Sequence, residues 1–168
     1  MVALAFAAGC DDADAPPPTP PPGGAAGMAG ASVCASDAEV VEHDDEVVDA
    51  PARWSGRHHV LHTLEIRAEL SLDPCTVVAF DTNAFAVVDG GGAILAQGSP
   101  EAPITFTSGV MPPGRGDWAG IEIRGDAAPS VFESVTVEYA GSVYFFFGQS
   151  GLRFDDGAQV SLSHVVVR

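Results

Sequence analysis

The segment Ile104–Gly125, ITFTSGVMPPGRGDWAGIEIRG, decides the fold class. In its first piece apolar residues alternate with threonine, and in its last piece Ile121 and Ile123 flank Glu122. Such alternation is typical of a β-strand with one buried and one solvated face. A loop rich in proline and glycine separates the two pieces, and Trp118 opens the second. The segment therefore predicts two short strands joined by a surface loop, with Trp118 covering the base of the loop or capping the core.

The same alternation continues over most of the chain after residue 60. Glycine, proline, aspartate or serine separates the short pieces, and no convincing long helical pattern follows Pro74. The chain is therefore predicted to be all-β. The alternating apolar positions are Ile104/Phe106, Ile121/Ile123, Val135/Val137/Tyr139, Leu152/Phe154 and Val160/Leu162.

Local patterning leaves two all-β architectures open. The dipeptide Asp-Gly, which is typical of hairpins, occurs twice and favours an antiparallel sandwich. In the other direction, the spacing from Val77 to Ile104 equals the spacing from Ile94 to Ile121. A fixed period favours a solenoid, in which each coil stacks on its neighbour.

Four motifs in a fixed order favour the solenoid. They are LEIRAELSLDPCTVVAF (64–80), GGGAILAQGSPEAPITFTS (90–108), GDWAGIEI (116–123) and VFESVTVEYAG (131–141). This order resembles the repeats of bacterial surface lipoproteins with a pectin-lyase-like fold. The resemblance covers about Val60 to Arg168. It implies a right-handed, single-stranded parallel β-helix, and we place this domain at residues 51–168.

The same resemblance bears on activity. Pectin-lyase-like enzymes cleave acidic polysaccharides with carboxylates that hold Ca²⁺ and a basic residue that abstracts a proton. The outward charged residues of this chain match no lyase motif, so we expect no catalytic residue, cofactor or metal and assign them to a candidate binding surface. The alternative is a polysaccharide-acting lyase or hydrolase. The residues assigned to the surface are Glu122, Arg124, Glu138 and Arg153, with Asp155 and Asp156 as further outward carboxylates.

The segment VYFFFGQ (143–149) places five large apolar residues in succession. They cannot all point inward from one strand, because side chains alternate between the two faces. Either the segment packs across an end or flank of the β-helix, or it presents aromatic rings to sugars or partners. On the second interpretation the candidate binding surface also contains Tyr144, Phe145, Phe146, Phe147 and Trp118.

The first ten residues, MVALAFAAGC, form a short apolar run that ends in small residues before Cys10. This ending resembles the lipobox of bacterial lipoproteins, which implies a lipidated Cys10 and a location in the cell envelope. The run lacks the usual basic segment, and Ala7 stands where leucine is more frequent. The alternative is a chance cysteine after an alanine-rich start. Residues 11–50, rich in Asp, Pro and Gly, are predicted to be a disordered tether and entry segment.

If Cys10 carries lipid, Cys34 and Cys75 remain as an even pair. In an oxidising compartment they would form a disulfide; two unrelated thiols are the alternative.

Overall charge limits the partners of the protein. Its formal net charge is −16, and it contains no lysine. Such a surface repels nucleic acid, so we expect a polysaccharide or a surface protein as partner, with the membrane contacted through the lipid anchor alone.

Two short motifs receive ordinary structural interpretations. His58, His59 and His62 lie close in sequence, with His43 nearby, but residues 58 and 62 of a strand lie about 13 Å apart. We therefore predict surface histidines and no metal site. The tripeptide Arg-Gly-Asp at 115–117 is interpreted as part of a turn.

The end of the sequence carries a further expectation. SLSHVVVR (161–168) is an apolar alternating strand, and a solenoid without a cap exposes its interior. We expect the β-helix to be incomplete at this end, or the aromatic segment to cover it.

Overall fold

The computed structural model describes residue 34 and residues 38–142 and 150–168. Within this part of the chain the regular structure consists of β-strands, and no helix is long and apolar enough to cross a membrane. The described residues from 34 onward belong to one compact unit. The strands are β1 (Val40–His43), β2 (Glu46–Val48), β3 (Ala52–Trp54), β4 (Arg57–Val60), β5 (Thr63–Ile66), β6 (Glu69–Leu72), β7 (Val77–Phe80), β8 (Phe85–Val88), β9 (Ala93–Gln97), β10 (Ile104–Ser108), β11 (Gly120–Ile123), β12 (Ser130–Val137), β13 (Leu152–Phe154) and β14 (Val160–Val167).

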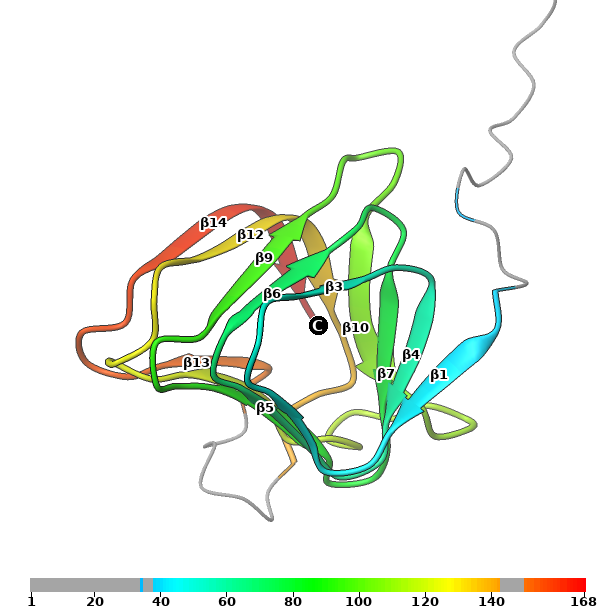
Figure 1. The fold of residues 1–168 in the computed structure, drawn as a ribbon. Helices are drawn as coiled ribbons and strands as arrows, with labels where there is room; N and C mark the ends of the chain where they lie inside the picture. The colour runs from blue at the N-terminus through cyan, green and yellow to red at the C-terminus, as the bar shows by residue number, and fades with distance from the viewer. Residues whose placement is uncertain (1–33, 35–37, 143–149) are drawn as a thin grey trace, which may run out of the picture. The chain divides into compact units, whose positions relative to one another are not determined.

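The strands wind into coils with three faces (Figure 1). The first face contains β1, β4, β7 and β10, the second contains β2, β5, β8, β11 and β13, and the third contains β3, β6 and β9. Each strand pairs in parallel with the strand one coil earlier and one coil later. This arrangement is a right-handed parallel β-helix, which confirms the predicted fold. The antiparallel sandwich is therefore excluded.

Two long strands bend at a corner, so that each forms part of two faces. The first half of β12 pairs with β9 on the third face, and its second half pairs with β10 on the first. Strand β14 follows β12 along its whole length. The bend falls at Ser134 in β12 and at His164 in β14, whose backbone φ angles are 50° and 54°. These left-handed residues let the hydrogen-bonded ladder continue around the corner.

The core is built from stacked inward positions. On the second face the register aligns Leu64, Ala86, Ile121 and Leu152 in successive coils. The first three are buried, and Leu152 is partly buried against the core. The alternation seen in the sequence thus supplies one inward row in each coil, and stacking these rows removes apolar surface from water. In the last coil Phe154 is 42% exposed.

Three details of the sequence interpretation need correction. Strands β1 and β2 lie inside the predicted tether 11–50, so the β-helix begins before residue 51. The spacing from Val77 to Ile104 is not the coil period, because Val77 pairs with Thr105. Ile94 and Ile121 lie on different faces, in β9 and β11. The Asp-Gly dipeptides connect parallel strands at corners instead of closing hairpins.

Candidate functional site

The second face carries a row of alternating charges where its strands end. Successive coils place Asp49, Arg67, Asp89, Arg124 and Asp155 one residue beyond β2, β5, β8, β11 and β13. The backbone ladder reaches these positions, since the amides of the last four each donate to a carbonyl of the preceding coil. Neighbouring parallel strands lie about 4.8 Å apart, so opposite charges face each other from coil to coil. We call this row the charge ladder.

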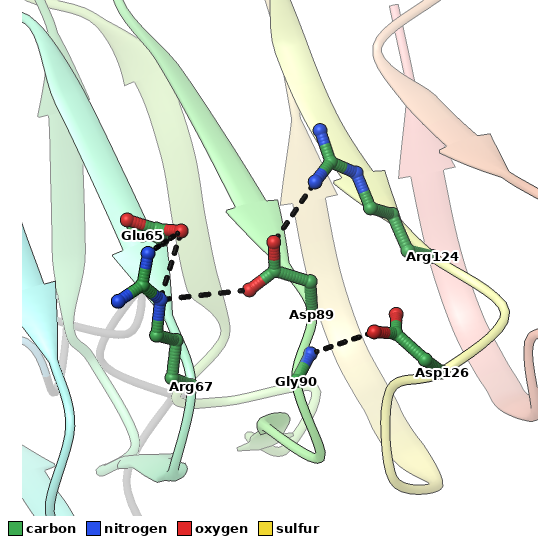
Figure 2. A network of polar contacts seen from close by, with 6 residues as sticks. All are labelled: Glu65, Arg67, Asp89, Gly90, Arg124 and Asp126. Carbon is green, nitrogen blue, oxygen red and sulfur yellow. Dashed lines mark hydrogen bonds and ion pairs between the residues drawn. The ribbon is translucent and has the colours of Figure 1, made fainter.

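The centre of the charge ladder is the carboxylate of Asp89 (Figure 2). Arg124 donates from Nη1 to Oδ2 of Asp89 over 2.9 Å, and Arg67 Nε lies 4.0 Å from Oδ1. Arg67 also donates to Oε1 of Glu65 from Nη2 over 2.6 Å and from Nε over 2.9 Å. The Asp89 side chain is 15% exposed, against 54% for Arg67 and 47% for Arg124. The accessible guanidinium of Arg124 is therefore held by Asp89 and that of Arg67 by Glu65, while the buried Oδ1 of Asp89 has no hydrogen-bond partner among the described residues.

The charge ladder continues into the following coil. Arg153 lies between two carboxylates, 3.3 Å from Asp155 Oδ1 and 3.8 Å from Glu122 Oε1. At the corner after Asp89, the amide of Gly90 donates to Oδ2 of Asp126 over 3.2 Å (Figure 2). Carboxylates therefore position each of the three guanidinium groups on this face.

The guanidinium of Arg67 carries a fixed positive charge in the ladder. The pKa of Arg67 is raised, first by its hydrogen bond to Glu65 and then by the negative charges of Glu65, Asp89 and Asp49. The guanidinium therefore remains protonated across the physiological range, and a protonated group cannot abstract a proton. What the row offers is an ordered series of hydrogen-bond donors and acceptors.

Comparison with protein families agrees with this fold. The family model described as "pectate-lyase like beta helix domain" matches residues 55–156, more than half of the chain. The chain belongs to the pectate-lyase-like β-helix family. No curated protein and no solved structure matches the chain. The matched region of the pectate-lyase-like domain contains the ladder from Arg67 to Asp155.

The pectate-lyase-like coils bring only part of the predicted surface together. Glu122, Arg124 and Arg153 lie on the second face, in the ladder or beside it. Glu138 lies on the first face, where it accepts from Thr107 Oγ1 over 3.0 Å and pairs with Arg168. The prediction missed Glu65, Arg67 and Asp89. For Arg67 and Asp89 the signal is a charged residue directly after an apolar strand, repeated in each coil, which becomes visible only once the register is known.

Trp118 does not belong to a surface. Its side chain is fully buried, and its ring stacks on Phe80 with the ring centroids 4.2 Å apart. Nε1 donates to the carbonyl of Glu138 over 2.9 Å, which satisfies the one polar atom of the indole. Trp118 therefore lies within the core, and its assignment to the binding surface is wrong. Tyr144, Phe145, Phe146, Phe147 and Cys10 lie outside the described residues.

The predicted disulfide is present. Cys34 and Cys75 are bonded, with their Cα atoms 5.2 Å apart. Cys75 occupies the corner between β6 and β7, so the bond ties the chain before β1 to the third coil. Covalent attachment at this corner fixes where the entry segment meets the β-helix.

Two histidines form an interior stack with Trp54, contrary to the predicted surface positions. The ring centroids of His43 and His58 lie 4.2 Å and 4.4 Å from that of Trp54, and both imidazoles are buried. His58 donates from Nε2 to the carbonyl of Ser55 over 3.1 Å, and its Nδ1 lies 2.9 Å from His43 Nε2 in a hydrogen bond between the two rings. His43 and His58 cannot both be protonated in this arrangement, because two facing N–H groups leave no acceptor for the bond.

Burial lowers the pKa of both stacked histidines, while Glu46 acts on His43 in the opposite direction. Unfolded imidazoles titrate near 6.5, so below that pH the unfolded chain binds more protons than the folded one. The stability that these neutral histidines contribute is present above pH 6.5 and is lost as the pH falls through their lowered values. His62 has the opposite sign: its pKa is raised by a hydrogen bond to Asp44, but it is fully exposed.

We predict that the free energy of unfolding falls as the pH is lowered from 7.5 to 5. Urea unfolding at several pH values measures it. The variant His58→Gln removes one buried imidazole and should flatten the slope, whereas His164→Gln, at an exposed histidine, should leave it unchanged. Equal slopes in all three proteins would show that the stack does not carry the pH dependence.

Proposed function

We propose that the protein is a cell-envelope lipoprotein whose β-helix presents a non-catalytic binding surface for carbohydrate or a surface partner. The observation that carries the proposal is the charge ladder. It lies on an exposed flank, and its groups repeat at the spacing of the coils. A ligand with a repeating series of hydroxyl groups is the kind of partner that a repeating series of charged groups can follow.

The ladder is suited to binding because its polar groups are held in place before a ligand arrives. A guanidinium offers five N–H donors, and the contacts with Asp89 and Glu65 use only some of those of Arg67 and Arg124, whose side chains are accessible. Carboxylates accept from sugar hydroxyls, and guanidinium groups donate to them, so both signs contribute. Pre-positioned side chains lose less conformational freedom on binding, which favours affinity.

A polysaccharide-acting enzyme is the second candidate. The close approach of carboxylates and arginines around Asp89 is the observation in its favour. Against Arg67 as the base stands its raised pKa, since an arginine must lose a proton before it can abstract one. A lyase would therefore need a base other than Arg67.

The envelope location rests on the sequence around Cys10 and on the cysteine pair. A disulfide persists in an oxidising compartment, which agrees with export. Lipid attachment at Cys10 can be tested in the same expressed protein that is used for the binding experiments. A labelled fatty acid should enter the protein expressed in a bacterium and should not enter the variant Cys10→Ser.

The surface is tested by screening purified protein against an array of neutral and acidic polysaccharides. We expect binding to at least one hydroxyl-rich polysaccharide, weakened at least about tenfold in Arg67→Gln and in Arg124→Gln, as for the loss of a charged contact. The matched control is Arg53→Gln, which removes an exposed arginine paired with Asp73 on the third face. This variant should bind like the wild type.

The same polysaccharides are incubated with the protein and analysed for shortened chains. If the wild type shortens a polysaccharide and Arg67→Gln does not, the protein is a polysaccharide-acting enzyme, and the proposal of a non-catalytic binding protein is wrong. Absence of binding to polysaccharides and to extracted envelope proteins would contradict the proposed function.

A further inference from the structure

Three metal-binding side chains converge at the corner between the first and second faces. Asp44 and Asp45 follow β1, and His62 follows β4. Because β1 and β4 pair in register, with His43 opposite Val60, the two corners stack on each other. One ligand atom from each of the three side chains lies within 4.8 Å of the other two. Sequence separation hides this group, since the histidine comes from a different coil.

The chemistry of the group selects a class of ion. Two carboxylates and one imidazole are a donor set that suits Zn²⁺ or Mn²⁺, whereas Ca²⁺ prefers oxygen ligands alone. His62 Nδ1 already lies 2.6 Å from Asp44 Oδ1. All three side chains are exposed, so small rotations can bring the donors to the 2.0–2.2 Å distances that zinc requires.

A second, independent observation is a pocket of about 370 Å³ beside the group. Asp45, His62 and Thr63 form one part of its lining, and the coil after His62 supplies the rest. That coil contributes the oxygen-bearing side chains of Thr82 and Asn83, and Phe85 adds an apolar side. Three protein donors leave coordination positions for water or a ligand, and this pocket provides space for them.

The surrounding charge also favours a cation. The protein has a formal net charge of −16, and the nearby Asp81 adds to the negative potential at His62. The ion pairs that arginines form within the described part of the chain involve carboxylates other than Asp44 and Asp45. No guanidinium ion pair there competes with a metal ion for these two carboxylates.

We propose that Asp44, Asp45 and His62 bind a divalent transition-metal ion, with open coordination positions facing the neighbouring pocket. This differs from the His58–His62 pairing considered from the sequence, because His58 points into the core. It also contradicts our expectation that the protein has no metal site. The site lies at a different corner from the charge ladder, so it stands or falls independently of the proposed function.

The test is calorimetric titration of the metal-stripped full chain with ZnCl₂, MnCl₂ and CaCl₂ at neutral pH. We expect Zn²⁺ to bind with one saturating site per chain and Ca²⁺ to bind more weakly. His62→Ala and Asp45→Asn should each weaken Zn²⁺ binding at least about tenfold, because each removes a direct ligand. Asp45→Asn keeps a residue type that tolerates the left-handed backbone at this position, where φ is 49°.

The control variant is His164→Asn, which removes an exposed imidazole in β14, keeps a residue type that tolerates the left-handed backbone there, and should bind Zn²⁺ like the wild type. Folding of each variant is checked by circular dichroism. A nitrogen chemical-shift change at His62 on adding Zn²⁺ should accompany binding. Unchanged affinity in both ligand variants, or tighter binding of Ca²⁺ than of Zn²⁺ in the wild type, would overturn the proposal.

Discussion

Replacing Trp118 with alanine is expected to lower the free energy of unfolding by about 3–5 kcal/mol. The indole is fully buried and stacks on Phe80, so its removal leaves a cavity in the core of the β-helix. The substitution also removes the donor to the carbonyl of Glu138. Because both the packing and the hydrogen bond join neighbouring coils, we expect this single change to have one of the largest effects in the chain.

Urea unfolding monitored by circular dichroism measures this effect. Phe154→Ala is the matched control, since that ring is 42% exposed in the last coil, and its loss should change the free energy of unfolding by about 1 kcal/mol or less. Similar losses in the two variants would mean that Trp118 is not the buried residue described here.

Removing the disulfide is expected to lower the free energy of unfolding by about 2–4 kcal/mol. Cys34 and Cys75 are separated by 41 residues in the sequence, so their bond considerably reduces the conformational entropy of the unfolded chain. The variant Cys34→Ser should therefore unfold at a lower urea concentration than the wild type. We choose Cys34 because Cys75 occupies a tight corner with φ at 67°, where substitution would add a second effect.

A reductant supplies the control for this experiment. Wild-type protein in reductant should unfold at the same urea concentration as Cys34→Ser, and the variant should not respond to reductant. Identical unfolding of wild-type protein with and without reductant, once mass spectrometry has verified reduction, would contradict the predicted stabilisation.

The sequence predicts the strands well but not how they pair. Alternation in the piece that contains Ile121 and Ile123 identifies a buried face directly, because a β-strand has a period of two. Parallel pairing depends on which coils meet, and this is not encoded locally. Ile94 and Ile121 show the difficulty: an equal spacing suggested one repeat, yet the residues lie on separate faces. Loops of different lengths vary the coil period, so only the register reveals it.

For the same reason, only part of the candidate site could be predicted from the sequence. Glu122 and Arg153 could be predicted as outward neighbours, because the corresponding strands are separated by one coil. Arg67 and Asp89 lie just beyond their strands, where alternation no longer indicates direction. His58 was misplaced because a histidine on the inward row looks the same in sequence as one on the outward row. Its burial depends on Trp54 and His43, which come from the preceding coil.

The bond between Cys34 and Cys75 also determines how the protein would respond to mechanical tension. Each coil is held to the next by hydrogen bonds directed along the axis, so a pull along this axis would open coils one after another. A force arriving through the N-terminal segment passes from Cys34 directly to Cys75 and bypasses the strands β1 to β6. The first two coils would therefore carry no load, and the disulfide would prevent the applied force from unfolding them.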